Sequence, residues 1–372
     1  MNGGAEKRPP RLRPAVLIPV LTVLTGLWGV LTIAASQYGA ASPLLLAGRQ
    51  LVFLIVGVAV MLIAASIPFA RHLEWRGFYL LAVMAALAGL PWHGVRVNGM
   101  GGWYEIGGFF LQPSELGKAV FLLVLAGAAV SPLAARRRFP LLGALALLWI
   151  VPVLLQPDFG TAAVYLLTWG VLYFATGGSG KGVIAGCGAA LLMLAGFIRL
   201  RPYAARRILM FLDPSLDPEG GGWHLRQLKL AIAQGGWTGS GMGRSVWSSS
   251  YLPLAYNDSA YAAMSETLGL LGTLPALAML ALLFWSLWRA SRDPRRSDAA
   301  AVYLGGAAVL LAVQSLLHIG VNVGLLPPTG LTLPLVSYGG SSLVGTSLMF
   351  GLAISAAAGT EGGSGYRPLF RV

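Results

Sequence analysis

Long apolar runs recur along the chain, and short polar segments separate them. Ten of these runs approach the roughly 20 residues that a helix needs to cross the hydrocarbon core of a bilayer. They cover residues 15–36, 50–70, 77–92, 112–132, 140–155, 160–177, 182–199, 262–288, 299–325 and 341–358. The pattern predicts an all-α polytopic membrane protein with about ten transmembrane helices, in which residues 1–372 form a single membrane domain.

One long polar passage, from Arg201 to Gly272, interrupts this pattern. Because apolar runs flank it, we expect residues 200–261 to form a large loop outside the membrane, between the seventh and eighth spans. Stretches rich in glycine and proline also occur at 98–118 and 324–342. Irregular backbone at membrane depth is tolerated only where protein or a wet cavity shields it. Both stretches are therefore predicted to line a cavity that opens to the exterior.

The composition supports a membrane protein. Hydrophobic residues make up 56% of the chain and charged residues 10%, whereas about a quarter of the residues in a soluble domain are charged. The basic segment 1–14 leads into the first apolar run without a small-residue cleavage site, which predicts a signal anchor. The net charge of +13 suits anionic lipid headgroups but identifies no ligand.

Cysteine and histidine usage gives no pattern of a dedicated metal site. Cys187 is the only cysteine and lies in an apolar run, so the sequence excludes disulfides and cysteine-based metal sites. The four histidines are scattered. We therefore expect no resident cofactor, while a divalent cation that accompanies an anionic substrate stays open.

Basic residues set the expected orientation, because short cytoplasmic loops of membrane proteins are enriched in them. They cluster before the first span and in alternate short loops, at Lys7, Arg8, Arg11, Arg13, Arg71, Arg76, Arg136, Arg137, Arg138, Lys181, Arg289, Arg292, Arg295 and Arg296. The other short loops hold little beyond Arg49 and Arg96. This pattern places the N-terminal segment 1–14 and the tail 359–372 in the cytoplasm, and the loop 200–261 outside.

Any chemistry on an external substrate must use the carboxylates on that side. The expected topology places eight of them there: Glu105, Glu115, Asp158, Asp213, Asp217, Glu219, Asp258 and Glu266. Glu115 and Lys118 are three residues apart at the head of an apolar helix, so they share a face and can pair. Ionisable groups within a span are costly and usually functional. The pair is therefore either a structural ion pair, part of the site, or both.

The other external aspartates have local interpretations. Asp158 precedes an apolar helix, where a carboxylate favours the N-cap position. Asp213 and Asp217 each precede a proline, which indicates turns. Asp258 begins the helix that carries Glu266, eight residues on and about 12 Å along the axis. These two carboxylates are too far apart to act as a pair, so Asp258 is either an N-cap or a single catalytic base.

Cations near the long loop could bind phosphate, because arginine offers a planar fork for phosphate oxygens. They are Arg199, Arg201, Arg206, Arg207, Arg226, Lys229 and Arg244. A glycine-rich stretch at 234–244 could present backbone N–H groups to an anion, although a flexible loop would have the same composition.

Five motifs occur together and in order in a known family. They are Gln112-Pro113-Ser114-Glu115 with Lys118, Gln156-Pro157-Asp158 with Gly160-Thr161, Phe211-Leu212-Asp213-Pro214 with Gly235-Gly236 and Gly239, Leu252-Pro253 followed by Asp258 and Glu266, and the run from Gly324 to Ser342. In these motifs the chain resembles the SEDS family of shape, elongation, division and sporulation proteins, which includes RodA and FtsW. The resemblance covers nearly the whole membrane region.

The resemblance implies a peptidoglycan glycosyltransferase that polymerises lipid II on the outer face of the bacterial cytoplasmic membrane. Asp258 matches the family's essential aspartate. Supporting or substrate-binding roles are implied for Glu115, Lys118, Asp158, Arg207, Gln227, Lys229, Glu266, Ser337 and Tyr338. The implied partners are lipid II, undecaprenyl-linked glycan, membrane lipids and a class B penicillin-binding protein that supplies transpeptidation; no nucleic acid is implied.

The chain also departs from the family pattern. Leu254 replaces an acidic residue, Thr267 replaces the second glutamate of a pair, and His318 stands at a common asparagine position. His224 and Lys229 resemble RodA, whereas residues 241–243 resemble FtsW, so a role in elongation or in division is not assigned.

Two other classes of function fit part of the sequence. Interrupted helices and membrane-embedded charges are also typical of transporters, so a lipid II flippase is the main alternative. The external concentration of carboxylates and the lack of an internal repeat favour the enzyme. A scaffold that only recruits other wall enzymes is a third alternative, and it leaves the cavity-lining motifs without a role.

Overall fold

Helices form at all ten predicted positions. The computed structural model describes residues 14–38, 43–97, 99–133, 135–200, 209–216, 221–252 and 254–359. The helices are α1 (Pro14–Ser36), α2 (Pro43–Ser66), α3 (Phe69–His93), α4 (Pro113–Ala129), α5 (Ala135–Leu155), α6 (Phe159–Ala175), α7 (Gly180–Leu200), α10 (Ala260–Ser291), α11 (Asp298–Asn322) and α12 (Gly340–Ala358). The terminal segments 1–13 and 360–372 lie outside the described residues.

Seven of these helices are long and apolar enough to cross a membrane: α1, α2, α3, α5, α10, α11 and α12. The apolar helix α6 is shorter, α7 has a shorter apolar stretch, and α4 has 17 residues that include Glu115 and Lys118. The multi-pass helical class is thus confirmed, while the count of ten spans stays a prediction.

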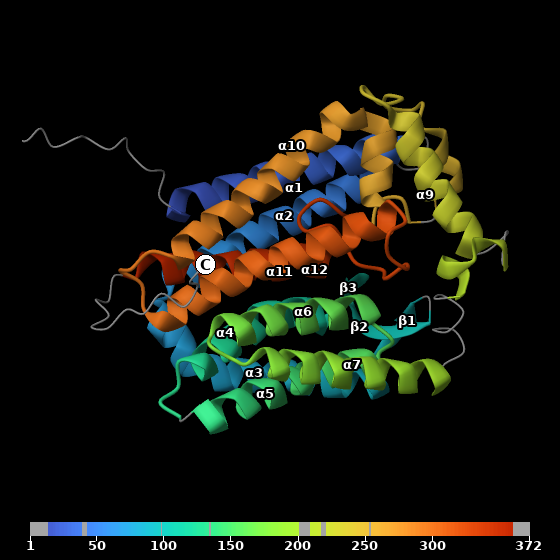
Figure 1. The fold of residues 1–372 in the computed structure, drawn as a ribbon. Coiled ribbons are helices and arrows are strands. Elements are labelled where there is room, and N and C mark those ends of the chain that lie inside the picture. The colour runs from blue at the N-terminus through green and yellow to red at the C-terminus, as the bar shows by residue number, and fades with distance from the viewer. Residues whose placement is uncertain are drawn as a thin grey trace, which may run out of the picture.

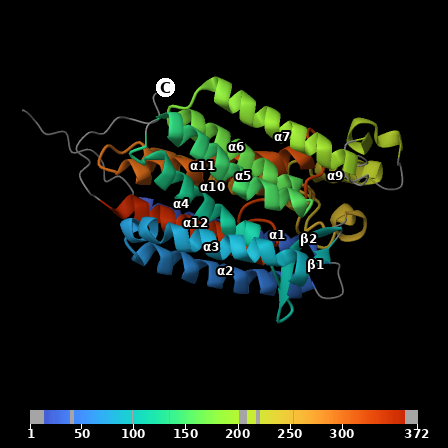
Figure 2. The same cartoon turned by 90° about the horizontal axis from the view of Figure 1, so that it is seen from below.

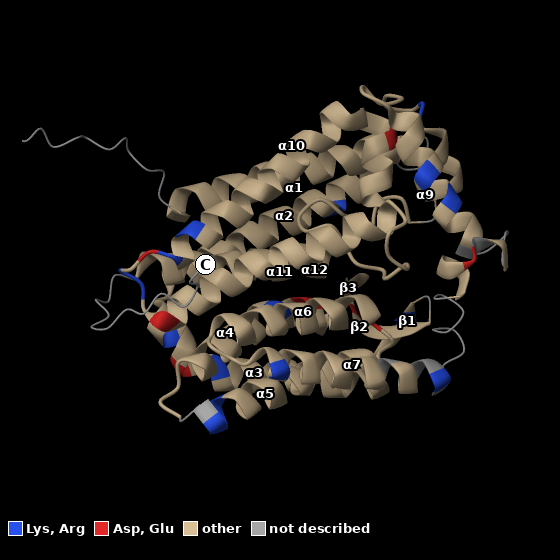
Figure 3. Ribbon diagram, in the orientation of Figure 1, with Lys and Arg blue, Asp and Glu red and all other residues tan. Residues whose placement is uncertain are grey.

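The helices run along a common direction in two groups (Figures 1 and 2). In Figure 1 the upper group holds α1, α2, α10, α11 and α12, and the lower group holds α3 to α7. Helix α1 begins and α12 ends at the same end of the bundle, and a small sheet and α9 lie at the other end. Most charged residues lie near these two ends (Figure 3), as expected for a bundle whose middle faces lipid.

The centre of the bundle consists of α11 and α12, whose most apolar stretches are 78% buried. Both helices are rich in alanine and glycine, and small residues let helix backbones approach closely in lipid. Helix α12 packs against α2 and α4. At Gly345 a side-chain carbon would lie only 2.5 Å from the carbonyl oxygen of Glu115, so this contact requires glycine.

The first glycine-rich passage forms a sheet, which the sequence analysis did not predict. Antiparallel strands β1 (Val95–Val97), β2 (Met100–Ile106) and β3 (Phe109–Leu111) lie side by side in that order. Gly107 and Gly108 join β2 to β3 with φ of +58° and +79°, as a two-residue hairpin turn requires. The hydroxyl of Tyr104 donates to the carbonyl of Ala86 in α3 at 2.6 Å, which ties the sheet to the bundle.

The predicted long loop contains local structure of its own. It holds a 3₁₀ turn (Pro214–Leu216), helix α9 (Gly221–Gly235) and a π-helical turn (Trp247–Tyr251). Asp213 forms the predicted turn: its carboxylate accepts from the Ser215 N–H at 3.0 Å and from the Ser215 hydroxyl. These bonds lower the pKa of the Asp213 carboxyl. Asp217 lies outside the described residues.

Helix α10 is broken near its start (Figure 1). Gly269 has φ +64° and ψ −169°, so residues 260–268 form a separate short segment before the long helix. A side-chain carbon on Gly269 would lie 2.3 Å from the backbone nitrogen of Gly239, so the loop packs directly into the break. The predicted run 262–288 is therefore divided at Gly269 instead of forming one continuous helix.

Candidate functional site

A cavity of about 430 Å³ lies at the end of the bundle that carries the sheet. Its lining comes from the first half of α2, the sheet, the start of α4, residues 157–161, residues 254–258 and residues 329–342. The two predicted passages, 98–118 and 324–342, therefore line the same cavity. Three acidic side chains contribute to it: Glu115, Asp158 and Asp258.

Asp258 is half-buried in the wall of the cavity. It precedes α10 by two residues, and Ser259 is the N-cap residue, so the N-cap interpretation of Asp258 is wrong. Its Oδ2 lies 3.7 Å from the position that a side-chain carbon on Gly330 would occupy. Gly330 thus lies at ordinary van der Waals distance from the carboxylate, and both residues line the cavity.

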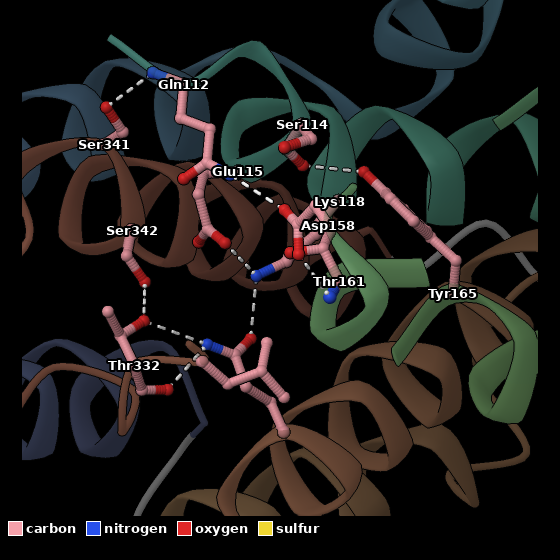
Figure 4. Close-up of polar contacts among 12 residues, drawn as sticks. Gln112, Ser114, Glu115, Lys118, Asp158, Thr161, Tyr165, Thr332, Ser341 and Ser342 are labelled. Carbon is pink, nitrogen blue, oxygen red and sulfur yellow. Dashed lines mark hydrogen bonds and ion pairs between the residues drawn. The ribbon is translucent and has the colours of Figure 1, made fainter. Parts of the chain in front are cut away.

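Glu115 and Lys118 form the predicted ion pair, 2.5 Å apart and almost fully buried (Figure 4). Lys118 also donates to Oε1 of Gln314 at 3.0 Å, and Gln314 donates to the carbonyl of Thr332 at 3.0 Å. Glu115 lines the cavity, whereas Lys118 lies behind it. The pair therefore joins α4, α11 and the 329–332 wall.

Asp158 is the N-cap of α6, as predicted. Its Oδ1 accepts from the Thr161 N–H at 2.9 Å, and its Oδ2 accepts from the side chain of Gln112 at 2.9 Å (Figure 4). The backbone N–H of Gln112 in turn donates to the Ser341 hydroxyl at 2.9 Å. Asp158 thus has a structural role and also lines the cavity.

We expect Asp158→Ala to destabilise the protein by about 1 kcal/mol, because it removes the N-cap acceptor. Asp158→Asn keeps a cap oxygen and should recover most of this loss. Thermal unfolding in detergent measures both variants. Equal destabilisation by alanine and asparagine would contradict the capping role and indicate that the charge matters.

Ser337 and Tyr338 have different places in the site. The Ser337 hydroxyl is buried and accepts from the Leu333 N–H at 2.8 Å, so it holds a turn. Tyr338 lines the cavity, and its N–H donates to the carbonyl of Tyr256 at 2.7 Å. The two tyrosine rings pack edge to face at 5.5 Å. Tyr338 therefore connects the 337–342 wall to the segment that carries Asp258.

Glu266 lies away from the cavity and is fully buried. Its carboxylate accepts from the N–H groups of Trp247 and Ser248 at 2.8 and 2.7 Å, and also from the Ser248 hydroxyl. Glu266 thus holds the loop against α10. This arrangement agrees with the expectation that Asp258 and Glu266 do not act as a carboxylate pair.

The predicted residues of α9 do not line the cavity. Gln227 is buried beneath the helix. Lys229 is exposed, and its Cε lies 2.5 Å from where a side-chain carbon on Gly324 would be. Arg207 lies outside the described residues, as do Arg201 and Arg206.

One cavity residue is a cation, Arg49, that was expected to lie in a loop. Arg49 lies in α2, has an exposed side chain and lines the cavity; it is the only lysine or arginine among the described residues that does. The predicted span began at residue 50, whereas α2 begins at Pro43. An arginine nearly two turns inside an apolar helix is costly and usually functional, and this was the signal that could have identified Arg49.

Within the described ranges, no three histidine, cysteine, aspartate or glutamate side chains gather closely enough to hold a metal ion. The three cavity carboxylates therefore do not form a ready-made cation site.

The described part of the chain is thus a polytopic helical membrane protein with a charged, carboxylate-lined cavity at one end of its bundle. Residues 15–361 match the sequence pattern of the cell cycle protein family of FtsW, RodA and SpoVE. The chain belongs to this family, which is the SEDS family.

Relatives and solved structures agree with this assignment. The probable peptidoglycan glycosyltransferase FtsW of Thioalkalivibrio sulfidiphilus is 36% identical, over 92% of this chain and 89% of that protein. A chain from a peptidoglycan synthase complex, described as coordinating polymerization and crosslinking, has a TM-score of 0.77 and 29% identity, over 92% of this chain and 97% of its own. RodA of Thermus thermophilus has a TM-score of 0.69 and 25% identity, over 92% and 96%.

Proposed function

We propose that this protein is a peptidoglycan glycosyltransferase of the cytoplasmic membrane that polymerises lipid II at the outer face. The observation that carries the proposal is the position of Asp258, with its carboxylate beside Gly330 in the cavity wall. The names of the FtsW relatives support the same reaction class. In this proposal ten spans leave both termini in the cytoplasm and the cavity on the outer side.

Asp258 acts as a general base in this mechanism. Its carboxylate takes the proton of the 4-hydroxyl of the acceptor lipid II. The freed oxygen attacks the anomeric carbon of the donor chain, a new glycosidic bond forms, and the bond from that carbon to undecaprenyl diphosphate breaks. A positioned base contributes roughly 10²–10⁴-fold to a rate. Holding two lipid-linked reactants in line adds a further entropic contribution.

Arg49 is the cation that meets the departing diphosphate in this proposal. The other charged side chains in the cavity lining are carboxylates, which repel an anion. An arginine fork pairs with phosphate oxygens in a bidentate way. The sequence analysis assigned this role to Arg207 and its neighbours, and those residues stay candidates beside Arg49.

Arg49→Ala should lower kcat/KM for lipid II by about 10- to 100-fold, because a hydrogen bond to a charged group contributes about 1.5–3 kcal/mol. Arg49→Lys keeps the charge without the fork and should lose less. Arg96→Ala is the matched control, since Arg96 is exposed on β1 and does not line the cavity. Equal losses in Arg49→Ala and Arg96→Ala would indicate general electrostatic attraction and contradict a specific contact.

The proposed partner is a class B penicillin-binding protein that crosslinks the new glycan. Support comes from the likeness to a chain of a peptidoglycan synthase complex that coordinates polymerization with crosslinking.

The test is a polymerisation assay with purified protein and labelled lipid II in detergent, with and without a class B partner. Parallel reactions contain Mg²⁺ or EDTA, which tests whether a divalent cation is needed at the diphosphate. We expect glycan polymer on gels. No polymer in any reaction would overturn the proposal, and lipid II flipping by the same protein in vesicles would then assign a transporter.

A further inference from the structure

Two buried polar residues of α11 lie behind the segment that carries Asp258. Asn322 and His318 are one helical turn apart, and their side chains are 0% and 1% exposed. Neither lines the cavity. Buried polar groups are costly unless they form hydrogen bonds, so the partners of these two side chains indicate what the residues do.

Asn322 binds the backbone at the start of α10. Its Oδ1 accepts from the N–H of Ala262 at 3.1 Å, and its Nδ2 donates to the carbonyl of Asp258 at 3.0 Å. The first N–H groups of a helix lack partners within the helix, and the Ser259 side chain makes no cap bond here. An asparagine from another helix therefore supplies the cap and holds the backbone of Asp258.

His318 fixes the orientation of that amide. Its Nδ1 lies 2.7 Å from the carbonyl oxygen of Leu331, which can only accept, so Nδ1 carries the proton. Nε2 of the neutral ring is then an acceptor, 3.3 Å from Nδ2 of Asn322. That Nδ2 also lies 2.9 Å from the carbonyl of His318. A flipped amide would point its oxygen at three acceptors, so only one orientation is stable.

The same contacts set the distance between two walls of the cavity. Asn322 holds Asp258, while His318 holds Leu331, the residue after Gly330. Gly330 is the residue that faces the Asp258 carboxylate. Two side chains on one helix thus hold the backbone that carries the carboxylate and the backbone opposite it.

We propose that Asn322 and His318 are positioning residues for Asp258, an inference that rests on the proposed function of that carboxylate. They touch no substrate. They place the backbone of Asp258 relative to the 329–332 wall of the cavity that must take the acceptor sugar. An error of about 1 Å in such placement can cost roughly 10²-fold in rate.

Asn322→Asp is the sharpest variant, because it preserves the shape of the side chain and the oxygen that caps Ala262. It replaces the donor Nδ2 with an oxygen that faces the carbonyl of Asp258. We expect kcat for lipid II polymerisation to fall about 10- to 100-fold while KM changes by less than about twofold, since the residue acts on placement and not on binding.

Two substitutions of His318 separate positioning from packing. His318→Asn retains a side-chain donor and acceptor, whereas His318→Leu fills a similar volume without either. Positioning predicts that the asparagine variant has at least about fivefold higher kcat than the leucine variant, a ratio equivalent to one well-made hydrogen bond. A packing role predicts that leucine performs as well as asparagine or better.

The experiment measures kcat and KM of the wild type, Asp258→Ala, Asn322→Asp and both His318 variants, with thermal unfolding of each. Thr168→Val is the control, since Thr168 is fully buried in α6 and its hydroxyl has no partner among the described residues. If Asn322→Asp does not fold, the comparison of His318→Asn with His318→Leu tests the same positioning role.

The outcomes separate the two proposals. An inactive wild type, or an active Asp258→Ala, overturns the proposed function. Loss of activity in Asp258→Ala with unchanged kcat in Asn322→Asp overturns only the positioning role, as does a raised KM at constant kcat. A fall in kcat at constant KM, with His318→Asn above His318→Leu, supports it.

Discussion

Asp258→Asn should reduce glycan polymerisation by roughly 10²–10⁴-fold, because an amide cannot take the proton of the acceptor hydroxyl. Asparagine has the shape of aspartate, so the cavity wall and the backbone bond from Asn322 should be retained. The loss should therefore appear in kcat, with protein yield and unfolding temperature close to those of the wild type. Single-turnover assays with labelled lipid II measure it.

Glu105→Gln is the matched control for this variant. Glu105 lies in β2 at the same end of the bundle, is exposed and does not line the cavity. Glu105→Gln removes one negative charge from the same region as Asp258→Asn does. Because Glu105 does not line the cavity, this variant should retain nearly full activity. If both variants lost activity equally, regional charge would explain the result. If Asp258→Asn polymerised lipid II normally, another group would be the base.

Lys118→Met should destabilise the protein by about 3–5 kcal/mol, because it leaves the buried carboxylate of Glu115 without its ammonium partner. Both side chains are almost fully buried, so water can replace only a small part of the lost ion pair. Gln314 also loses the donor to its Oε1, which weakens the link between α4 and α11. Chemical or thermal unfolding in detergent measures the change.

The double variant Glu115→Gln with Lys118→Met should recover most of this stability, because it leaves no unpaired charge. Lys181→Met is the surface control: Lys181 is exposed at the start of α7, and its loss should change stability by less than about 0.5 kcal/mol. A double variant no more stable than Lys118→Met would mean that the pair stabilises through packing and not through charge.

The positions of the helices were predictable because the determinants are local. A span in lipid must satisfy its backbone hydrogen bonds within itself, so an apolar run of sufficient length becomes a helix whatever surrounds it. The helix boundaries were less certain, and at Arg49 the error was consequential. A start at Pro43 instead of residue 50 turned a loop charge into a cavity residue.

The sheet and the break in α10 needed more than periodicity. Gly107-Gly108 between two short runs rich in aromatic residues is a hairpin pattern, so the β2–β3 turn was predictable. Gly269 gives no such indication, since one glycine in a helical pattern is common. Its conformation follows from packing against Gly239 across a loop of about thirty residues.

By itself, the sequence determined the multi-pass helical class, the family, the paired Glu115 and Lys118, and the cap at Asp158. These follow from apolar length, short-range spacing and the order of motifs, all of which the chain displays directly. Only the tertiary structure decided that Glu266 holds the loop, that Arg49 lines the cavity and that Asn322 and His318 hold Asp258. Those contacts join residues far apart in the chain, and their geometry depends on how the helices pack, which spacing along the sequence does not encode.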